Sequence, residues 1–234
     1  MPALYEHRIM TGSKSNSVFS GQCRIFVICS ALICSSAALA GEDSRKGTLV
    51  KAGSSIDLFK QWPELAHAPK SQMGTIEFFI RPDAEAVARP RSFVFTLSNL
   101  GGRDSSGVSL TLHQGVVRAH VLGTTLDSKV KLSAGRWSHI ALTINTTTVN
   151  KRGRLWIDGK PMADELILEY WPNTFEVAEM FSDHWNLGRL FSGHIGDVRI
   201  SGSVQYETPF KPPSHLSKTK QTVLLLKGNA IPLR

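Results

Sequence analysis

Apolar side chains alternate with polar or small ones through most of the chain beyond residue 70. The pattern is clearest in residues 135–144, where isoleucine or leucine fills every second position from residue 140. A period of two predicts a β-strand with one buried face. A second apolar run, residues 154–157, is closed by Asp158-Gly159, a pair that favours a tight hairpin turn. We therefore predict two paired strands and a turn over residues 137–162, with a loop over residues 145–153.

The rest of the chain predicts further short strands and no convincing helix. Strands are expected over residues 48–51, 54–58, 74–82, 92–98, 108–112, 116–121, 166–168, 185–188, 194–200 and 222–227. Residues 60–72 are interpreted as an irregular connection, and residues 83–90 as a loop or one helical turn. Many short strands joined by Gly- and Pro-rich turns are typical of an all-β sandwich or barrel.

The inward face of these strands supplies a predicted core. Alternation places seven large apolar side chains on that face: Ile76, Phe78, Ile140, Leu142, Ile157, Val198 and Ile200. Histidine 139 lies on the opposite face of its strand, where we expect a structural role rather than a catalytic one. Asp158 is interpreted as a turn former and Asp197 as a structural acid near a strand end.

The first 40 residues have the physical character of a secretory signal peptide. Arg24 precedes an apolar and small-residue run, residues 25–40, which ends in the small-x-small sequence Ala38-Leu39-Ala40. The run is shorter than the ~20 residues that span a membrane. We expect cleavage after residue 40 and a secreted, cell-envelope or periplasmic protein without a membrane span. A retained anchor, and a translation start at Met10 instead of Met1, stay open as alternatives.

Composition narrows the class of the exported part. Residues 41–234 fit one domain. The three cysteines, Cys23, Cys29 and Cys34, all precede residue 40, so disulfides and thiolate chemistry are not expected in that domain. Of the formal net charge of +8, +2 falls in residues 1–40, so the exported part carries +6. This charge favours anionic partners, although the basic residues are scattered and solubility explains them equally well. No nucleic-acid motif is present, and we expect no nucleic-acid binding.

Four stretches then carry a family resemblance. They read Gly-Thr-Ile-Glu-Phe-Phe-Ile-Arg-Pro (74–82), Gly-Arg-Trp-Ser-His-Ile-Ala (135–141), Leu-Trp-Ile-Asp-Gly-Lys (155–160) and Phe-Ser-Gly-His-Ile-Gly-Asp-Val-Arg-Ile (191–200). In this order they resemble the strand motifs of laminin-G-like domains among the concanavalin A-like lectin and glucanase jelly rolls. Phe79 stands where that family commonly has tryptophan. The resemblance implies an antiparallel two-sheet sandwich over residues 47–228, after a short linker, 41–46, and before a C-terminal tail, 229–234.

The same fold family includes glycoside hydrolases, but their chemistry is not visible in this sequence. Those enzymes place alternate acids along one strand, so that two carboxylates face one substrate bond. The acids here, such as Asp83 and Glu85 or Glu176 and Glu179, lie in predicted loops or lack that spacing. Zinc-protease, serine-hydrolase and phosphate-loop motifs are also missing. An enzyme is therefore the less favoured interpretation.

Three groups of residues are candidate binding sites. The first group is an aromatic turn with a nearby tryptophan: Tyr170, Trp171, Asn173 and Trp185. Such side chains suit stacking on sugar rings, although aromatics also fill gaps at sandwich edges. The second group is a predicted basic hairpin tip formed by Lys151, Arg152 and Arg154. It suits binding of a sulfate or a carboxylate, and a solvated loop without a ligand is the alternative. The resemblance further implies calcium, which takes six to eight oxygen ligands, and the candidate ligands are Asp104 and Asp183. His184 and His194, near Asp183, form a weaker alternative metal site.

These observations favour a secreted, non-enzymatic recognition module that binds a polysaccharide, a glycoconjugate or another extracellular surface ligand. Two alternatives stay open. One is a diverged glycoside hydrolase of the same fold, and the other is a structural or adhesive domain that binds a cell-surface protein.

The aromatic turn gives a first testable prediction. Replacing Trp171 by alanine should weaken glycan retention without unfolding the domain, because stacking on a sugar ring is lost while the core stays intact. Affinity chromatography on immobilised glycans and thermal melting would measure the two effects. Unchanged retention in the variant would contradict the stacking role.

Overall fold

The computed structural model describes residues 45–63, 74–98, 107–145, 151–168, 177–182 and 190–233. These ranges all belong to one compact unit, Glu42–Arg234. The predicted signal peptide lies outside them. Within them the chain forms β-strands and two short helices, α1 (Leu58–Gln61) and α2 (Ala84–Ala88). The strands are β1 (Thr48–Val50), β2 (Ile56–Asp57), β3 (Thr75–Pro82), β4 (Ser92–Ser98), β5 (Val108–His113), β6 (Val116–Val121), β7 (Thr124–Lys131), β8 (Ser138–Asn145), β9 (Lys151–Ile157), β10 (Lys160–Leu168), β11 (Val177–Met180), β12 (Gly193–Ser201) and β13 (Thr222–Leu226).

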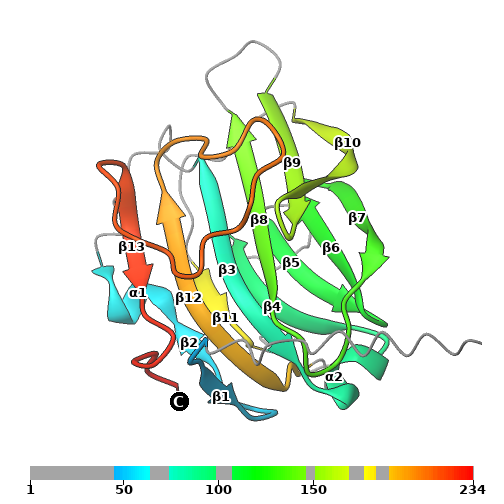
Figure 1. The fold of residues 1–234 in the computed structure, drawn as a ribbon, viewed down its shortest axis with the longest axis vertical. Coiled ribbons are helices and arrows are strands. Elements are labelled where there is room, and N and C mark those ends of the chain that lie inside the picture. The colour runs from blue at the N-terminus through cyan, green and yellow to red at the C-terminus, as the bar shows by residue number, and fades with distance from the viewer. Residues whose placement is uncertain are drawn as a thin grey trace, which may run out of the picture. The chain divides into compact units, whose positions relative to one another are not determined.

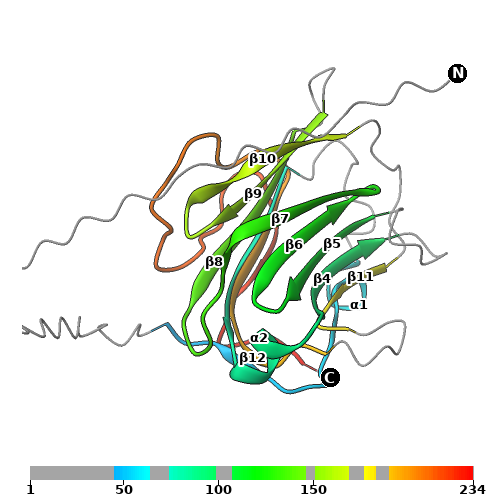
Figure 2. The same ribbon diagram turned by 90° about the vertical axis from the view of Figure 1, so that its right-hand side faces the viewer.

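The strands build two antiparallel sheets that pack face to face (Figures 1 and 2). The seven-stranded sheet has the order β1-β12-β3-β8-β9-β10, and β13 also pairs with β12. The six-stranded sheet has the order β2-β11-β4-β5-β6-β7. The prediction of an all-β, two-sheet sandwich is therefore confirmed.

The core fills the space between the two sheets. All seven predicted core residues are buried, and none is more than 3% exposed: Ile76, Phe78, Ile140, Leu142, Ile157, Val198 and Ile200. They pack in one cluster with inward side chains of the six-stranded sheet, including Phe95, Leu110 and Leu126. The interdigitation of two alternating apolar faces accounts for the sandwich.

Several predicted boundaries were wrong where apolar alternation is weak. Residues 151–153, predicted as a loop, begin β9, and the turn ends at Lys160, where β10 starts. The pattern also missed β7, an edge strand on which only Leu126 and Ser128 are buried, and the four-residue β11. The predicted strand over residues 54–58 is only β2, because the Asp57 side chain accepts a hydrogen bond from the Lys60 amide and caps α1.

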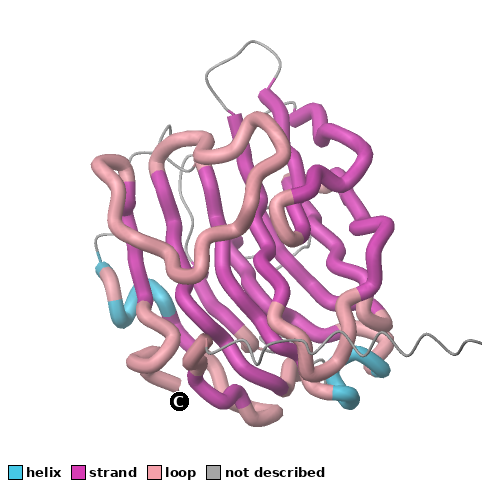
Figure 3. Tube along the Cα trace, viewed as in Figure 1, coloured by secondary structure: helices cyan, strands magenta, loops and turns pink. Residues whose placement is uncertain are grey.

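A long segment without strand or helix, residues 202–216, crosses the outer face of the seven-stranded sheet (Figures 1 and 3). We call it the crossing segment. The Thr75 hydroxyl donates to the carbonyl of Ser203 at 2.9 Å and accepts from the Gln205 amide at 2.9 Å. The Phe210 amide donates to the Gly159 carbonyl at 3.0 Å. These bonds fix the segment to β3 and to the β9–β10 turn.

A buried polar network lies beneath the crossing segment. The Glu77 carboxylate accepts from Arg199 Nε at 2.7 Å and from the Tyr206 hydroxyl at 2.8 Å, and its Oε2 lies 3.0 Å from His139 Nε2. Tyr206 stacks on Phe210 with ring centroids 3.6 Å apart. The Glu77 and His139 side chains are fully buried, which supports the structural role expected for His139.

The charge state of Glu77 is set by this network. Burial by itself raises the pKa of Glu77, but the hydrogen bond with His139 and the charge of Arg199 outweigh burial and leave the pKa below its ordinary value. A carboxylate whose pKa is depressed on folding stabilises the folded state above its unfolded pKa, and this stabilisation is lost as the pH falls through the folded pKa.

Acidification is therefore expected to weaken the fold through Glu77. Below pH 4.5, the ordinary carboxyl value, the urea midpoint of the wild type should fall more steeply than that of Glu77→Gln, which has no group to titrate at this position. Urea unfolding followed by tryptophan fluorescence, repeated from neutral pH to acid, measures both curves. Parallel curves for the two proteins would show that Glu77 does not control this pH dependence.

Both ends of the domain meet at β12. Strand β1 pairs with its first half and β13 with its second half. The Thr48 hydroxyl donates to the Gly228 carbonyl at 2.6 Å. Asp197, in the same strand, accepts from the amides of Leu216 and Gly228, both at 2.9 Å, so it has the structural role that was expected. It lies at the bulge in the middle of β12 rather than at a strand end.

No helix in the described ranges is long and apolar enough to cross a membrane.

Candidate functional site

The outward face of the six-stranded sheet is polar across all its strands. Because Phe95, Leu110 and Leu126 point into the core, the residues next to them point outward. Register aligns these outward residues in two rows across the strands. One row contains Asp57, Glu179, Thr96, Ser109, His120 and Thr125, and the other contains Phe93, Thr111, Arg118 and Asp127. We call these two rows the polar face.

Charged and hydrogen-bonding groups order one side of the polar face. The Arg118 guanidinium donates to both Asp127 oxygens, at 2.6 and 2.7 Å. His120 Nδ1 lies 3.1 Å from the Thr125 hydroxyl. The hydrogen bonds from Arg118 hold the pKa of Asp127 below its ordinary value, so this carboxylate stays ionised at neutral pH. The polar face therefore presents a fixed guanidinium and a fixed carboxylate side by side.

The centre of the polar face holds hydroxyl groups that are almost inaccessible to water. Thr96 and Ser109 are 6% exposed and Thr111 is 1% exposed. The Ser109 hydroxyl has no hydrogen-bond partner within the part of the chain that the structure describes. A buried polar atom without a partner costs about 1–3 kcal/mol, and such atoms are uncommon in native structures. Next to this centre, the Arg91 guanidinium lies 4.7 Å from the centroid of the Phe93 ring.

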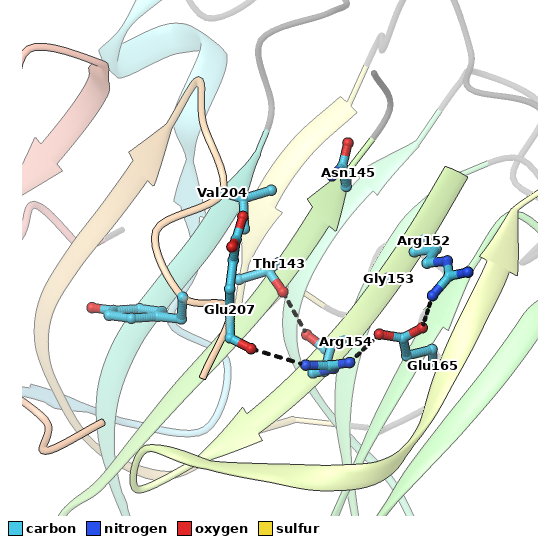
Figure 4. Close-up of a pocket in the computed structure, with 9 residues that line it drawn as sticks. Thr143, Asn145, Arg152, Gly153, Arg154, Glu165, Val204 and Glu207 are labelled. Carbon is cyan, nitrogen blue, oxygen red and sulfur yellow. Dashed lines mark hydrogen bonds and ion pairs between the residues drawn. The ribbon is translucent and has the colours of Figure 1, made fainter. Parts of the chain in front are cut away.

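A pocket of about 240 Å³ opens on the outer face of the other sheet (Figure 4). Strands β8, β9 and β10 form one side of it, and the crossing segment forms the other. Its lining residues are Thr143, Asn145, Arg152, Gly153, Arg154, Glu165, Val204, Tyr206 and Glu207. The side chains that line it alternate on each strand with inward core residues such as Leu142, Ile144 and Leu155.

One carboxylate organises the pocket. Glu165 accepts a hydrogen bond from Arg152 Nη1 at 2.8 Å and forms a second ion pair with Arg154 (Figure 4). Arg154 Nη1 also donates to the Glu207 backbone carbonyl at 3.2 Å. Two guanidinium groups thus share one carboxylate, and Arg154 links the β9–β10 hairpin to the crossing segment.

Most of the sequence-predicted site residues lie outside the described ranges. These are Tyr170, Trp171, Asn173 and Trp185 of the aromatic group and Asp104 and Asp183 of the calcium group. In the sequence, residues 170–173 precede β11 and Trp185 follows β11. Trp62, another tryptophan in a region predicted as irregular, is partly buried and packs against the core.

The basic residues are placed differently from the prediction. Arg152 and Arg154 lie within β9 rather than at a hairpin tip, and both are paired with Glu165. Lys151 is the first residue of the same strand, and its side chain is outside the described part. Because β9 starts earlier than expected, these arginines face the pocket and not a solvated loop.

The other expectations concern metals and turns. Among the described residues, no three His, Cys, Asp or Glu side chains are close enough to hold a metal ion. His194 lies in β12 beside Arg81, and burial together with that guanidinium lowers its pKa. Asp158 has φ of 50° and accepts a hydrogen bond from the His139 amide at 2.8 Å, as suits a turn former.

The sequence alone missed both the polar face and the wall of the pocket. The polar face depends on which residues of six strands stand opposite one another, and strand alternation does not contain that register. The pocket wall includes Val204, Tyr206 and Glu207, which follow a strand and precede a Pro-rich stretch. The prolines at 209, 212 and 213 favour an extended segment, but they give no sign of where this segment crosses the sheet.

The sheet order and the two packed layers define a β-sandwich of the jelly-roll class. The chain belongs to the concanavalin A-like lectin/glucanases superfamily, whose family model matches residues 59–205. No curated protein sequence is significantly similar to the chain.

Solved structures show the same fold at low sequence identity. The CBM40 module of the Ruminococcus gnavus IT-sialidase, bound to α2,3-sialyllactose, is 20% identical, with a TM-score of 0.51 over 64% of this chain and 86% of that one. A Bacteroides ovatus protein, provisionally classed as carbohydrate-binding, is 15% identical, with a TM-score of 0.51 over 67% of this chain and 46% of that one.

Proposed function

We propose that this protein is a secreted carbohydrate-recognition module and that the polar face binds its ligand. The observation that carries the proposal is the Arg118–Asp127 pair, a partly exposed guanidinium and carboxylate held side by side on the polar face. Sugar hydroxyls both donate and accept hydrogen bonds, so they suit a surface that offers a guanidinium and a carboxylate together. The fixed pair needs no reorientation on binding, which lowers the entropic cost of association.

Two further observations and one sequence prediction support the proposal. The structurally similar Ruminococcus gnavus module binds a sialylated sugar. The charge of +6 on residues 41–234 favours glycans that carry acidic groups. The predicted signal peptide would deliver the domain to the extracellular or envelope compartment in which such glycans occur.

The charge state of Asp127 suits hydrogen bonding better than acid catalysis. A glycosidase needs one carboxyl group with a raised pKa to protonate the leaving oxygen. Asp127 is held in the opposite state, because Arg118 lowers its pKa. We therefore assign Asp127 to hydrogen bonding and not to acid catalysis.

Replacing Arg118 by methionine is expected to weaken glycan retention by about 10-fold or more, since a charge-assisted hydrogen bond contributes about 1.5–3 kcal/mol. Folding should change little, because Arg118 and Asp127 are both partly exposed. A glycan array of residues 41–234, with and without calcium, would find the ligand, and calorimetry on the best glycan would compare the variants.

Arg136→Met is the matched control, because it removes the same charge from an exposed turn away from the polar face. Equal affinity of the two variants would contradict the assignment of the polar face. Release of shorter sugars from array glycans would support the hydrolase alternative instead. An array without hits, together with a co-purifying protein, would favour the adhesive alternative.

A further inference from the structure

The pocket of Figure 4 belongs to the opposite sheet from the polar face, and the proposed function does not use it. We propose that it is a second saccharide site, which takes one neutral, hydroxylated sugar ring through the Arg152–Glu165–Arg154 group. With two independent sites on opposite layers, the domain would hold two glycan chains, or two parts of one chain.

The charges of the pocket select this ligand class. Arg152 and Arg154 bring two positive charges, and Glu165 and Glu207 bring two negative ones, so the formal charges of the lining residues cancel. A free sulfate or carboxylate would have to approach Glu165, which both arginines already contact. A neutral sugar avoids this repulsion, because adjacent hydroxyls can accept from a guanidinium and donate to a carboxylate at once.

Donors and acceptors remain available in the pocket. Arginine has five N–H donors, and the hydrogen bonds of the Arg152 side chain in the described structure use only Nη1. Its Nε and Nη2 groups are therefore open to a ligand. Arg152 is 56% exposed and Glu165 is 31% exposed, so both groups are accessible from solvent.

The pocket is held ready for a ligand on both sides. On one side, the two arginines fix the orientation of Glu165. On the other side, Tyr206 is fixed by its hydrogen bond to Glu77 and by stacking on Phe210. Side chains that are already ordered lose little entropy on binding. A volume of about 240 Å³ is below the ~300–1,000 Å³ of sites for drug-sized ligands, which suits a single ring better than an extended chain.

The test follows backbone amides of residues 41–234 by NMR during titration with lactose, maltose, cellobiose and inorganic sulfate. We expect at least one disaccharide to shift the amide resonances of Gly153 and Glu165 in a saturable way. A sugar concentration of about 10 mM is sufficient to detect Kd values in the millimolar range. Arg152→Met and Glu165→Gln should each weaken that binding by about 10-fold, from the loss of one charge-assisted hydrogen bond. Arg136→Met should leave it unchanged.

Two results would overturn the proposal. One is the absence of any saturable shift at these amides with the three disaccharides, and the other is a shift caused by sulfate but not by a sugar. Amide spectra of each unliganded variant show whether it remains folded. Failure here does not affect the polar face, because glycan binding there is tested by Arg118→Met and by amides of β5 and β6.

Discussion

Replacing Glu77 by alanine is expected to lower the free energy of unfolding by about 3–5 kcal/mol, the usual result of removing one partner from a buried ion pair. The Arg199 side chain, which is only 7% exposed, would then lack its carboxylate partner. His139 and Tyr206 would lose the same acceptor. Urea unfolding at neutral pH, followed by tryptophan fluorescence, measures the change.

A double variant separates the ion pair from simple loss of volume. Replacing Glu77 and Arg199 together by methionine removes both buried charges and keeps apolar bulk, so it should be more stable than Glu77→Ala alone. A loss below about 1 kcal/mol in Glu77→Ala would show that the network contributes little and that water or other groups replace the carboxylate.

Replacing Gly159 by alanine should also destabilise the protein strongly, by about 2–5 kcal/mol. Gly159 has φ of +75°, a conformation that costs an L-residue about 1–2 kcal/mol. A β-carbon there would stand 1.8 Å from the carbonyl oxygen of Phe210. Relieving that overlap requires moving the crossing segment, which adds about 1–3 kcal/mol.

Gly123→Ala is the matched control for this prediction. Gly123 has a similar φ of +86°, but an added β-carbon would meet no atom within 4 Å. Its replacement should therefore cost only the backbone strain. Thermal melting of the two variants, with limited proteolysis of the crossing segment, distinguishes strain from displacement. Equal losses of stability, with equal protease resistance, would mean that the crossing segment adapts to Gly159→Ala without strain.

The sandwich was predictable because its strands follow local rules. Ile140 and Ile157 lie on alternating faces that the sequence displays directly, and the Asp158-Gly159 turn has the residues that positive φ requires. The edge strand β7 was missed for the same reason, since an edge strand exposed on most of its length has little apolar signal to show.

The buried network and the pocket depend on contacts that strand alternation does not display. Glu77 meets His139, Arg199 and Tyr206 across separations of 62, 122 and 129 residues. The pairing of Arg154 with Glu165 needs the irregular register of the β9–β10 hairpin, which shifts between Pro161 and Glu165. Charge composition marked these arginines as candidates, but only the fold brings the acid that neutralises them.

The meeting of β1 and β13 on one strand brings residues 48 and 228 within a single hydrogen bond of each other. A partner protein fused before residue 45 and another fused after residue 233 would therefore emerge from neighbouring points of the domain. Such an arrangement lets the unit be inserted as a side branch into a longer polypeptide without separating the parts on either side.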